Sequence, residues 1–320
     1  MKLRSLGKTG VEVSEVGFGA WAIGGSSYGP TQDDASLEAL EAAWEHGVTF
    51  YDTADTYGHG HSETLLARFL KGRPRDQVIL ASKAGWNFYE PPSRKCFTPA
   101  HLRFACEQSL KRLDTGYLDV YQLHNPSLEE IQRGEAVEEL DRLRREGKIR
   151  VIGISVHRQE EALAALQDDR VQTLQLIFNL LDQRMAGRVF QEARSRGVGL
   201  IAREPLASGL LTGKYHGDHV FEKDDHRRRW TKEKLGLDCR KTELIRGVLA
   251  AERLSLVQAA LEFVLDFEEI STVIPGVKTR AQLLENVLAS EQPCLRIQES
   301  SQLRELYKSN ELFSQGLIPR

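Results

Sequence analysis

The sequence predicts an α/β protein built as a (β/α)8 TIM barrel, with eight parallel strands inside a ring of helices. Eight short β-rich runs recur along the 320 residues, and apolar residues between them follow the three- and four-residue spacing of amphipathic helices. The length also suffices, since such a barrel usually takes roughly 250 residues. Strands that alternate with helices pair in parallel, and eight such units favour a closed barrel over an open doubly wound sheet.

The elements are expected in a fixed order along the chain. An N-terminal β-hairpin in "LRSLGKTGVEVSEV" turns around Gly7 to Gly10 and closes the bottom of the barrel. The eight strands then correspond to VGFGAW from Val16, VTFYDTA from Val48, VILASKA from Val78, LDVYQLH from Leu118, IRVIGIS from Ile149, TLQLIFN from Thr173, GLIARE from Gly199 and TVIPG from Thr272. Three of the intervening helical runs are followed by glycines, where left-handed residues commonly end a helix: Gly47, Gly147 and Gly197.

One connection, after the seventh strand, is much longer than the others. It runs from Leu206 to about Thr242 and is polar, whereas such connections usually take about 2 to 6 residues. Loops that follow the strands form the active face of a barrel, so this long loop is predicted to be a lid. No linker interrupts the alternation, and residues 1–320 are expected to form a single domain.

Composition is that of an ordinary globular protein, with 41% hydrophobic and 28% charged residues and a net charge of -3. This charge gives no reason to expect nucleic acid or an acidic membrane as a partner. The N-terminus has no apolar segment of a signal peptide and no stretch is long enough to span a bilayer, so we expect a cytoplasmic protein without membrane association. Cys96, Cys106, Cys239 and Cys294 lie far apart, which argues against disulfides or a zinc site. Nothing in the sequence indicates the oligomeric state.

Two glycine motifs suggest nucleotide binding, but each fails a structural requirement. "GFGAWA" from Gly17 matches a dinucleotide fingerprint, yet turn residues follow where a helix should begin, and about twenty positions later there is no acidic residue at the end of a second strand, where a ribose contact would be expected. "GLLTGKY" from Gly209 has three residues between its glycines where a phosphate loop has four, and Tyr215 replaces the magnesium-binding hydroxyl. Its backbone amides and Lys214 could still meet a phosphate in another geometry.

Polar side chains gather at the ends of three neighbouring predicted strands. Asp52 ends the second strand, Tyr57 follows it, Lys83 ends the third and His124 ends the fourth. In a barrel these four meet at one rim. A nearby ammonium can bring the pKa of a tyrosine into working range as a proton donor, Asp52 can hold Lys83, and His124 can bind a carbonyl oxygen. Each residue alone could be structural, but their convergence predicts a catalytic site.

The motifs together resemble the aldo-keto reductase family over nearly the whole chain. "FYDTADTYGHGHSE", "SKAG" and "YQLHNP" resemble its catalytic segments, and "AREPLASGLLTGKY" and "VIPGVKTRAQLLENV" resemble its cofactor signatures. The chain is similar to bacterial members and to the branch that includes potassium-channel beta-subunit-like proteins. The resemblance implies that Asp52, Tyr57, Lys83 and His124 form the catalytic tetrad. It also implies that NADPH, or NADH, binds in extended form without a Rossmann domain.

The resemblance further implies a set of cofactor contacts. Ser155 and Gln175 would lie near the nicotinamide carboxamide, and Phe178 would stack on its ring. The remaining contacts implied are Gly19, Ala20, Trp21, Arg203, Pro205, Leu206, Ser208, Gly209, Leu211, Gly213, Lys214, Gly276, Lys278, Arg280, Gln282, Glu285 and Asn286. The two cations at 278 and 280 suit a 2′-phosphate and favour NADPH. Val156 and His157 stand where many members have Asn, and Phe178 where Tyr is frequent.

The function expected is NADPH-dependent reduction of an aldehyde or ketone, with Tyr57 as general acid, reversible on alcohols. Two alternatives remain. His59 and His61 could join Asp52, Asp55 and His124 in the metal site of a barrel hydrolase, or the fold could serve as a cofactor-sensing regulatory protein. Asp55 is otherwise expected to be a loop or capping residue. Substrate-pocket aromatics are expected among Trp21, Tyr28, Trp86, Phe88 and Tyr89, and the basic run His226 to Trp230 could hold phosphates or an anionic substrate.

Overall fold

Eight parallel strands form the centre of the protein. The computed structural model describes residues 1–25, 27–249 and 254–315. The strands are β3 Phe18–Gly19, β4 Phe50–Asp52, β5 Ile79–Ala84, β8 Leu118–His124, β9 Ile149–Ser155, β10 Thr173–Ile177, β11 Gly199–Arg203 and β12 Ile270–Ile274. They are hydrogen-bonded in the order β12-β11-β10-β9-β8-β5-β4-β3. Isolated parallel bridges from Val16 to Val273 and from Gly19 to Gly276 join the two edges, so the predicted barrel is confirmed.

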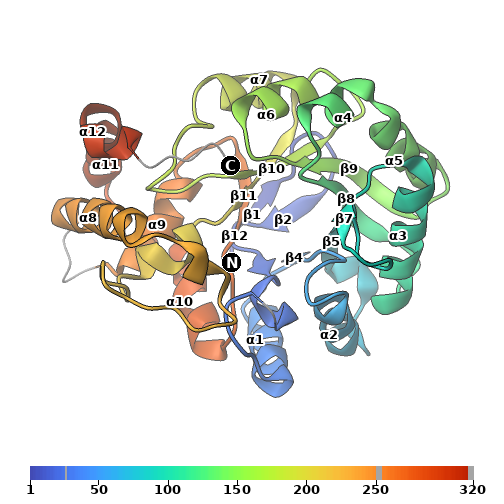
Figure 1. Ribbon diagram of the computed structural model, residues 1–320, viewed down its shortest axis with the longest axis horizontal. Coiled ribbons are helices and arrows are strands. Elements are labelled where there is room, and N and C mark those ends of the chain that lie inside the picture. The colour runs from blue at the N-terminus through green and yellow to red at the C-terminus, as the bar shows by residue number, and fades with distance from the viewer. Residues whose placement is uncertain (26, 250–253, 316–320) are drawn as a thin grey trace.

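Helices surround the strands on all sides of the view in Figure 1. They are α1 Asp33–Glu45, α2 His61–Leu70, α3 Pro99–Arg112, α4 Leu128–Arg133, α5 Glu135–Arg145, α6 Gln159–Ala165, α7 Arg188–Arg196, α8 Lys232–Val248, α9 Leu256–Leu265, α10 Arg280–Glu291, α11 Ile297–Ser309 and α12 Glu311–Ser314, with 3-10 turns η1 Ala22–Gly24, η2 Arg75–Gln77, η3 Ala207–Thr212 and η4 His226–Arg229. Gly47, Gly147 and Gly197 have φ of 72°, 76° and 71°, the left-handed conformation expected of them.

The N-terminal hairpin covers one end of the barrel, as predicted. It consists of β1 Leu3–Ser5 and β2 Glu12–Ser14, paired antiparallel. Leu6, Val11 and Val13 pack in one buried cluster with inward-facing residues of the strands, such as Phe50 and Ile201. This plug fills the barrel end opposite the strand ends that carry the polar residues.

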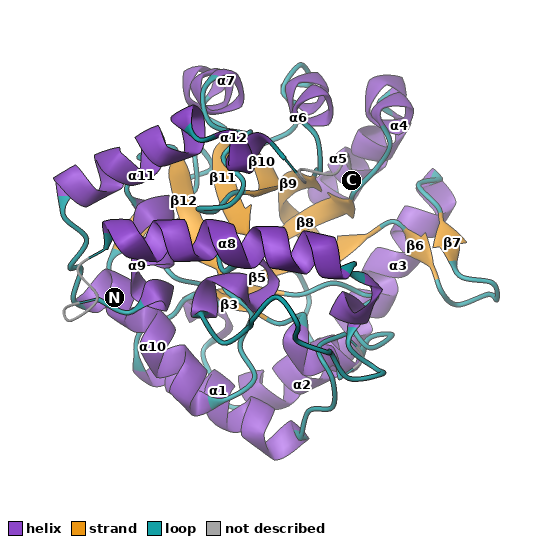
Figure 2. Cartoon of the chain, turned by 60° about the vertical axis from the view of Figure 1, so that its left-hand side comes forward, coloured by secondary structure: helices purple, strands orange, loops and turns teal. Residues whose placement is uncertain are grey.

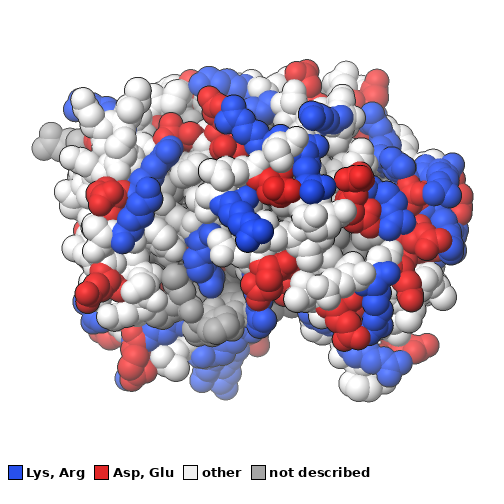
Figure 3. Space-filling view, turned by 90° about the horizontal axis from the view of Figure 1, so that it is seen from above, with Lys and Arg blue, Asp and Glu red and all other residues white. Residues whose placement is uncertain are grey.

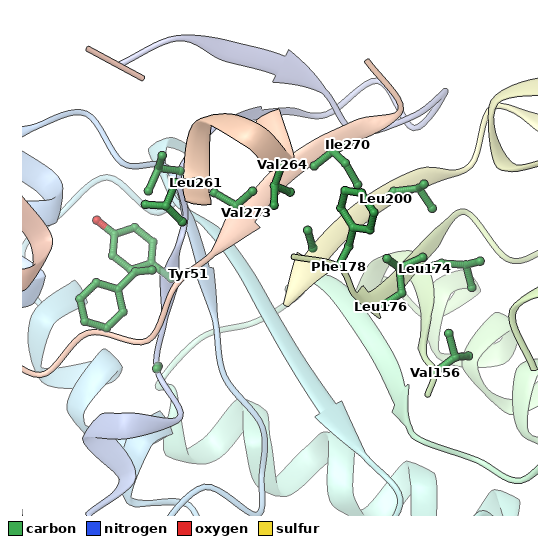
Figure 4. Close-up of a cluster of buried hydrophobic side chains, with 14 of the residues drawn as sticks. Tyr51, Val156, Leu174, Leu176, Phe178, Leu200, Leu261, Val264, Ile270 and Val273 are labelled. Carbon is green, nitrogen blue, oxygen red and sulfur yellow. The ribbon is translucent and has the colours of Figure 1, made fainter. Parts of the chain in front are cut away.

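Side chains along each strand alternate between the inside of the barrel and the helix layer. On β8, Val120 belongs to the inner cluster while Tyr121 and Leu123 belong to the outer core, so Gln122 and His124 point inward. A second, larger core lies between the strands and the helices. Figure 4 shows part of it, with Leu176 and Phe178 near Leu200. The same alternation therefore determines which polar side chains reach the interior.

The long segment after β11 is more ordered than the sequence suggested. It contains η3, η4 and most of α8, which begins after the capping residue Thr231. The prediction of one continuous loop was wrong, because α8 buries only a few side chains and its polar sequence hides the helical spacing. Figure 2 shows α8 crossing in front of the strands. An unpredicted hairpin, β6 Trp86–Asn87 with β7 Arg94–Lys95, projects from the opposite side.

The face shown in Figure 3 carries acidic and basic side chains in alternation, without a large area of one sign. Within the described ranges, every helix is too short or too polar to cross a bilayer.

Candidate active site

Lys83 is the centre of a compact polar cluster at the carboxyl ends of β4, β5 and β8. Its Nζ donates to Asp52 Oδ2 at 2.6 Å, to the Thr53 carbonyl oxygen at 2.8 Å and to the Tyr57 hydroxyl oxygen at 3.3 Å. Lys83 is fully buried and Asp52 is 2% exposed. The ring of His124 meets the ring of Tyr57 edge-on, with 5.9 Å between their centroids. The structure thus brings together the four residues predicted for catalysis.

Two glutamines fix the carboxylate of Asp52. Gln175 Nε2 donates to its Oδ1 at 2.7 Å, and Gln122 Nε2 does so at 3.4 Å. Both amides point inward, from β8 and β10, the strands on either side of β9. With one oxygen held by amides and the other by Lys83, Asp52 has a single orientation from which it positions the ammonium.

Opposing effects set the proton affinity of the two reactive groups. Burial raises the pKa of Tyr57 above its ordinary 10.0, and the positive charge of Lys83 only partly opposes this. The expected net lowering of this pKa is therefore wrong, because the effect of burial outweighs that of the ammonium. Burial also disfavours the charge on Lys83, but Asp52 and Tyr57 raise the pKa of Lys83 overall. At neutral pH the site holds a phenol and an ammonium.

His124 is a neutral imidazole at the same rim. Burial, together with the nearby positive charges of Lys83 and Arg203, holds the pKa of His124 well below 6.5. Its Nδ1 has no hydrogen-bond partner among the residues that the structure describes. A neutral ring can donate one N–H to an oxygen without adding a charge to the site.

A cavity of about 1000 Å³ opens from this cluster and extends over the ends of β9, β11 and β12. Its wall contains Asp52, Tyr57 and His124 at one end and Gln282, Glu285 and Asn286 of α10 at the other. Of the predicted cofactor contacts, it is lined by Gly19, Trp21, Ser155, Gln175, Arg203, Pro205, Leu206, Ser208, Gly209, Lys214, Gly276, Lys278, Gln282, Glu285 and Asn286. The cavity has the volume expected of a site for a cofactor-sized ligand.

A sequence model of the aldo/keto reductase family matches residues 15–308 of this chain. The chain belongs to this family.

Individual relatives agree with this assignment. An aldo-keto reductase of Bacillus subtilis is 37% identical over 230 residues, which cover 71% of this chain and 69% of the relative. The NADH-specific methylglyoxal reductase of Escherichia coli is 28% identical, with 90% of this chain and 93% of the relative covered. Among solved structures, the holo form of an aldo-keto reductase from Bacillus halodurans superposes with a TM-score of 0.81 at 29% identity, with 96% of each chain covered. The glycerol dehydrogenase of Gluconobacter oxydans gives 0.78 at 27% identity, with 96% and 95% covered.

Aldo-keto reductases are oxidoreductases that act on small-molecule carbonyl substrates with nicotinamide cofactors, and the cavity fits such a cofactor. Asn286 is 2% exposed, lines the cavity, and its Nδ2 has no partner within the described part of the chain. This amide nitrogen can donate a hydrogen bond to an acceptor atom of a bound nucleotide. Gly209 has a φ of 91°, which turns the backbone of the β11 loop along the wall, and Lys214 and Lys278 add positive charge suited to phosphates.

Phe178 does not reach the cavity of the reductase, so its predicted stacking on the nicotinamide ring is corrected. Its side chain is fully buried between the barrel and the helices, where it packs against Phe190 at 4.9 Å and Phe267 at 4.8 Å between ring centroids. The physical reason is the alternation of side chains. Gln175 points inward, and three positions further along the chain Phe178 belongs to the outer core.

Four other predicted contacts also lie away from the cavity wall. Arg280 donates to Glu45 at 2.8 Å on the surface, because it begins α10 and its side chain extends toward α1. Ala20 and Leu211 are fully buried, and Gly213 ends η3 in a left-handed conformation. The predicted contact between the Arg280 side chain and the cofactor is thus corrected. Of the two predicted cations at 278 and 280, Lys278 lines the cavity.

Several cavity residues were not predicted. They are Ala22, Thr56, Asn125, His157, Glu204, Thr212, Tyr215, Thr231, Lys234, Val257 and Ile274. Most of them are adjacent in sequence to a predicted residue. This proximity is the signal that could have indicated their place in the cavity wall. Arg227, Arg229 and Trp230 of the basic run line the cavity too, so these side chains can contact a molecule bound there.

The aromatic residues expected in the substrate pocket divide into two groups. Trp21, Tyr28 and Trp86 line the cavity. Phe88 and Tyr89 do not: Phe88 stacks on His59 with 5.2 Å between centroids, and the Tyr89 hydroxyl accepts from Arg112 at 3.0 Å. Two tryptophans and a tyrosine of this set therefore belong to the cavity wall.

Two of the residues considered for a metal site are engaged elsewhere. His61 Nε2 contacts Asp33 at 2.9 Å, while Asp52 is held by Lys83 and the glutamines. Across residues 1–25, 27–249 and 254–315, no three His, Cys, Asp or Glu side chains gather in a geometry suited to a metal ion. The geometry gives no support to a metal-dependent hydrolase.

Proposed function

We propose that the protein is an NADPH-dependent reductase of aldehydes or ketones in which Tyr57 is the general acid. The observation that carries this proposal is the position of the Lys83 ammonium, between Asp52 and the Tyr57 hydroxyl at the end of a cofactor-sized cavity. A bound nicotinamide cofactor supplies the hydride. The protein has to orient the carbonyl group and deliver one proton.

The side chains around the carbonyl oxygen divide this work. His124, neutral and at the cavity wall, can donate an N–H to the oxygen and orient it. As negative charge develops on that oxygen, Tyr57 transfers its hydroxyl proton to it, and the ammonium of Lys83 stabilises the phenolate left behind. On an alcohol the same groups work in reverse, with the phenolate as base.

Purified protein with NADPH and a panel of aldehydes and ketones tests the proposal through the loss of nicotinamide absorbance. Turnover that requires Tyr57 would support it. Tight NADPH binding with negligible turnover on every substrate would instead indicate a cofactor-sensing regulatory protein. Localisation in the cytoplasm and a single folding unit over residues 1–320 belong to the same proposal, and cell fractionation and limited proteolysis test them.

The preference for NADPH is expected to depend on Lys278. Lys278→Ala should weaken NADPH binding by about 10- to 100-fold, the value of a charge-assisted hydrogen bond to phosphate, with little change for NADH. The measurement is Kd for both cofactors by fluorescence titration. Arg280→Ala is the matched control, because Arg280 pairs with Glu45 outside the cavity and its loss should change neither Kd. A larger effect at Arg280 than at Lys278 would contradict this assignment.

The pH dependence of reduction should lack a histidine step. The pKa of His124 lies well below 6.5, so kcat/KM should not break near that value. Reduction needs protonated Tyr57, whose raised pKa keeps the acid form present at neutral pH and loses it only as pH rises into the alkaline range. The measurement is kcat/KM from about pH 5.5 to 10 in constant-ionic-strength buffers. A step near 6.5 that disappears in His124→Gln would show that the imidazole is charged in the working range.

A further inference from the structure

A buried acid lies behind the tetrad and has no role in the chemistry above. Asp55 is fully buried, and neither of its carboxyl oxygens has a side-chain partner among the described residues; the adjacent Thr56 N–H lies near the carboxyl group and slightly favours its charged form. Its peptide N–H donates to the carbonyl oxygen of Lys83 at 3.2 Å, which ties this part of the Tyr57 loop to the end of β5. Burying a polar group without a partner costs free energy, so an acid at this place requires an explanation.

Glu63, which is fully buried in α2, lies on this side of the tetrad and is paired with a cation. Glu63 Oε2 accepts from Arg112 Nε at 2.6 Å, and its Oε1 accepts from Ser82 Oγ at 2.6 Å. Arg112 also donates to the Tyr89 hydroxyl at 3.0 Å. Glu63, Tyr89 and Ser109 thus accept hydrogen bonds from the three nitrogens of the guanidinium, and Asp55 is a second acid beside Glu63.

Charged and titratable groups face Asp55 from all the elements around it. They are Glu63 of α2, Arg112 of α3, Lys83 of β5, Tyr121 of β8 and Tyr89 of the β6–β7 hairpin. Burial and the negative charge of Glu63 raise the pKa of Asp55 well above 3.8, and the positive charges of Arg112 and Lys83 do not compensate. If Asp55 carries its proton, the buried charges balance, since Glu63 offsets Arg112 and Asp52 offsets Lys83.

We propose that Asp55 is a positioning residue that retains its proton in the working enzyme, so that Lys83 faces one carboxylate and directs its charge to Tyr57. Loss of that proton would place a second negative charge beside Lys83. The added charge would weaken the effect of the ammonium on the phenol and make Tyr57 a poorer acid. The effect of Asp55 on Tyr57 rests on the proposed function. The protonation state of Asp55 is independent of that function.

The first test is thermal stability against pH for wild type and Asp55→Asn, which keeps the shape but cannot ionise. A protonated buried acid stabilises the fold fully below its ordinary pKa of 3.8, and the contribution is lost as pH rises through the raised native value. The Tm of Asp55→Asn should therefore gain on that of wild type as pH rises from about 4, and the difference should level off once the native group ionises. Asp34→Asn, an exposed acid of α1, is the control and should show no such trend. A Tm difference that is independent of pH would overturn the proposal.

The second test is the pH profile of NADPH-dependent kcat/KM. Asp55→Asn should move the alkaline fall of reduction to lower pH, because without a second carboxylate the ammonium of Lys83 stabilises the Tyr57 phenolate more strongly, while Asp34→Asn should superimpose on wild type. Identical profiles for wild type and Asp55→Asn in two active enzymes would overturn the positioning role alone. Absence of turnover in both would overturn the proposed function and the positioning role with it.

Carboxyl 13C titration of aspartate-labelled wild type measures the protonation of Asp55 without any variant. If no aspartate titrates far above 3.8, the proposed protonation of Asp55 is overturned.

Discussion

Replacing Tyr57 with phenylalanine is expected to lower kcat for carbonyl reduction by about 10²- to 10⁴-fold, the range that a positioned general acid contributes. The Tyr57 hydroxyl is the group at the cavity wall that lies within 3.3 Å of the Lys83 ammonium, so its removal leaves the developing alkoxide without its proton source. The ring remains, and so does its stacked contact with Trp21. NADPH binding should therefore stay near the wild-type value, and the loss should appear in kcat.

Tyr51→Phe provides a matched control for this experiment. Tyr51 precedes Asp52 on β4 but points into the outer core, and its hydroxyl has no hydrogen-bond partner within the described ranges. Removing the hydroxyl oxygen of Tyr51 should leave turnover unchanged. Full activity in Tyr57→Phe, or an equal loss in both variants, would mean that another group donates the proton. The measurement is single-turnover reduction followed at the nicotinamide band.

Replacing Lys83 with methionine is expected to lower the free energy of unfolding by about 3–5 kcal/mol, the cost of breaking a buried ion pair on one side. The change would leave the carboxylate of Asp52 buried with only amide partners. Turnover should fall as well, because the phenolate of Tyr57 loses its stabilising charge. Urea unfolding monitored by circular dichroism, together with steady-state kinetics, measures both effects.

Two comparisons show whether buried charge is the cause. Lys148→Met removes a lysine that pairs with Glu107 at 2.7 Å but is 28% exposed, and it should cost at most about 1 kcal/mol. The double variant Lys83→Met with Asp52→Asn removes both charges and should recover part of the lost stability, although not the activity. Equal losses for Lys83→Met and Lys148→Met would contradict the explanation.

The barrel and the tetrad could be predicted because both depend on local patterns. Short apolar runs specify strands, and parallel pairing brings all their carboxyl ends to one rim, so polar residues at those ends must meet. The helix α8 could not be recognised in the same way. It lies outside the barrel and buries few side chains, so its sequence lacks the apolar spacing that identifies a core helix.

Individual contacts at the rim were less predictable, and two residues show why. Phe178 follows β10 directly, where the alternation of the strand still applies and turns its ring into the outer core. Arg280 stands two positions after Lys278, but it begins a helix and reaches Glu45 instead of the cavity. The sequence indicates which helix or strand carries a side chain. The direction in which that side chain points depends on how the helix or strand is aligned with its neighbours.

The closure of the barrel has a consequence for how cofactor binding and folding are related. The first strand is only two residues long, and the two sheet edges meet through isolated bridges, one of them between Gly19 and Gly276. Both glycines also line the cavity. A molecule bound across them adds contacts to the seam between the two sheet edges. Binding at this seam would therefore stabilise the closed barrel, because the ligand binds the folded state and not the unfolded chain.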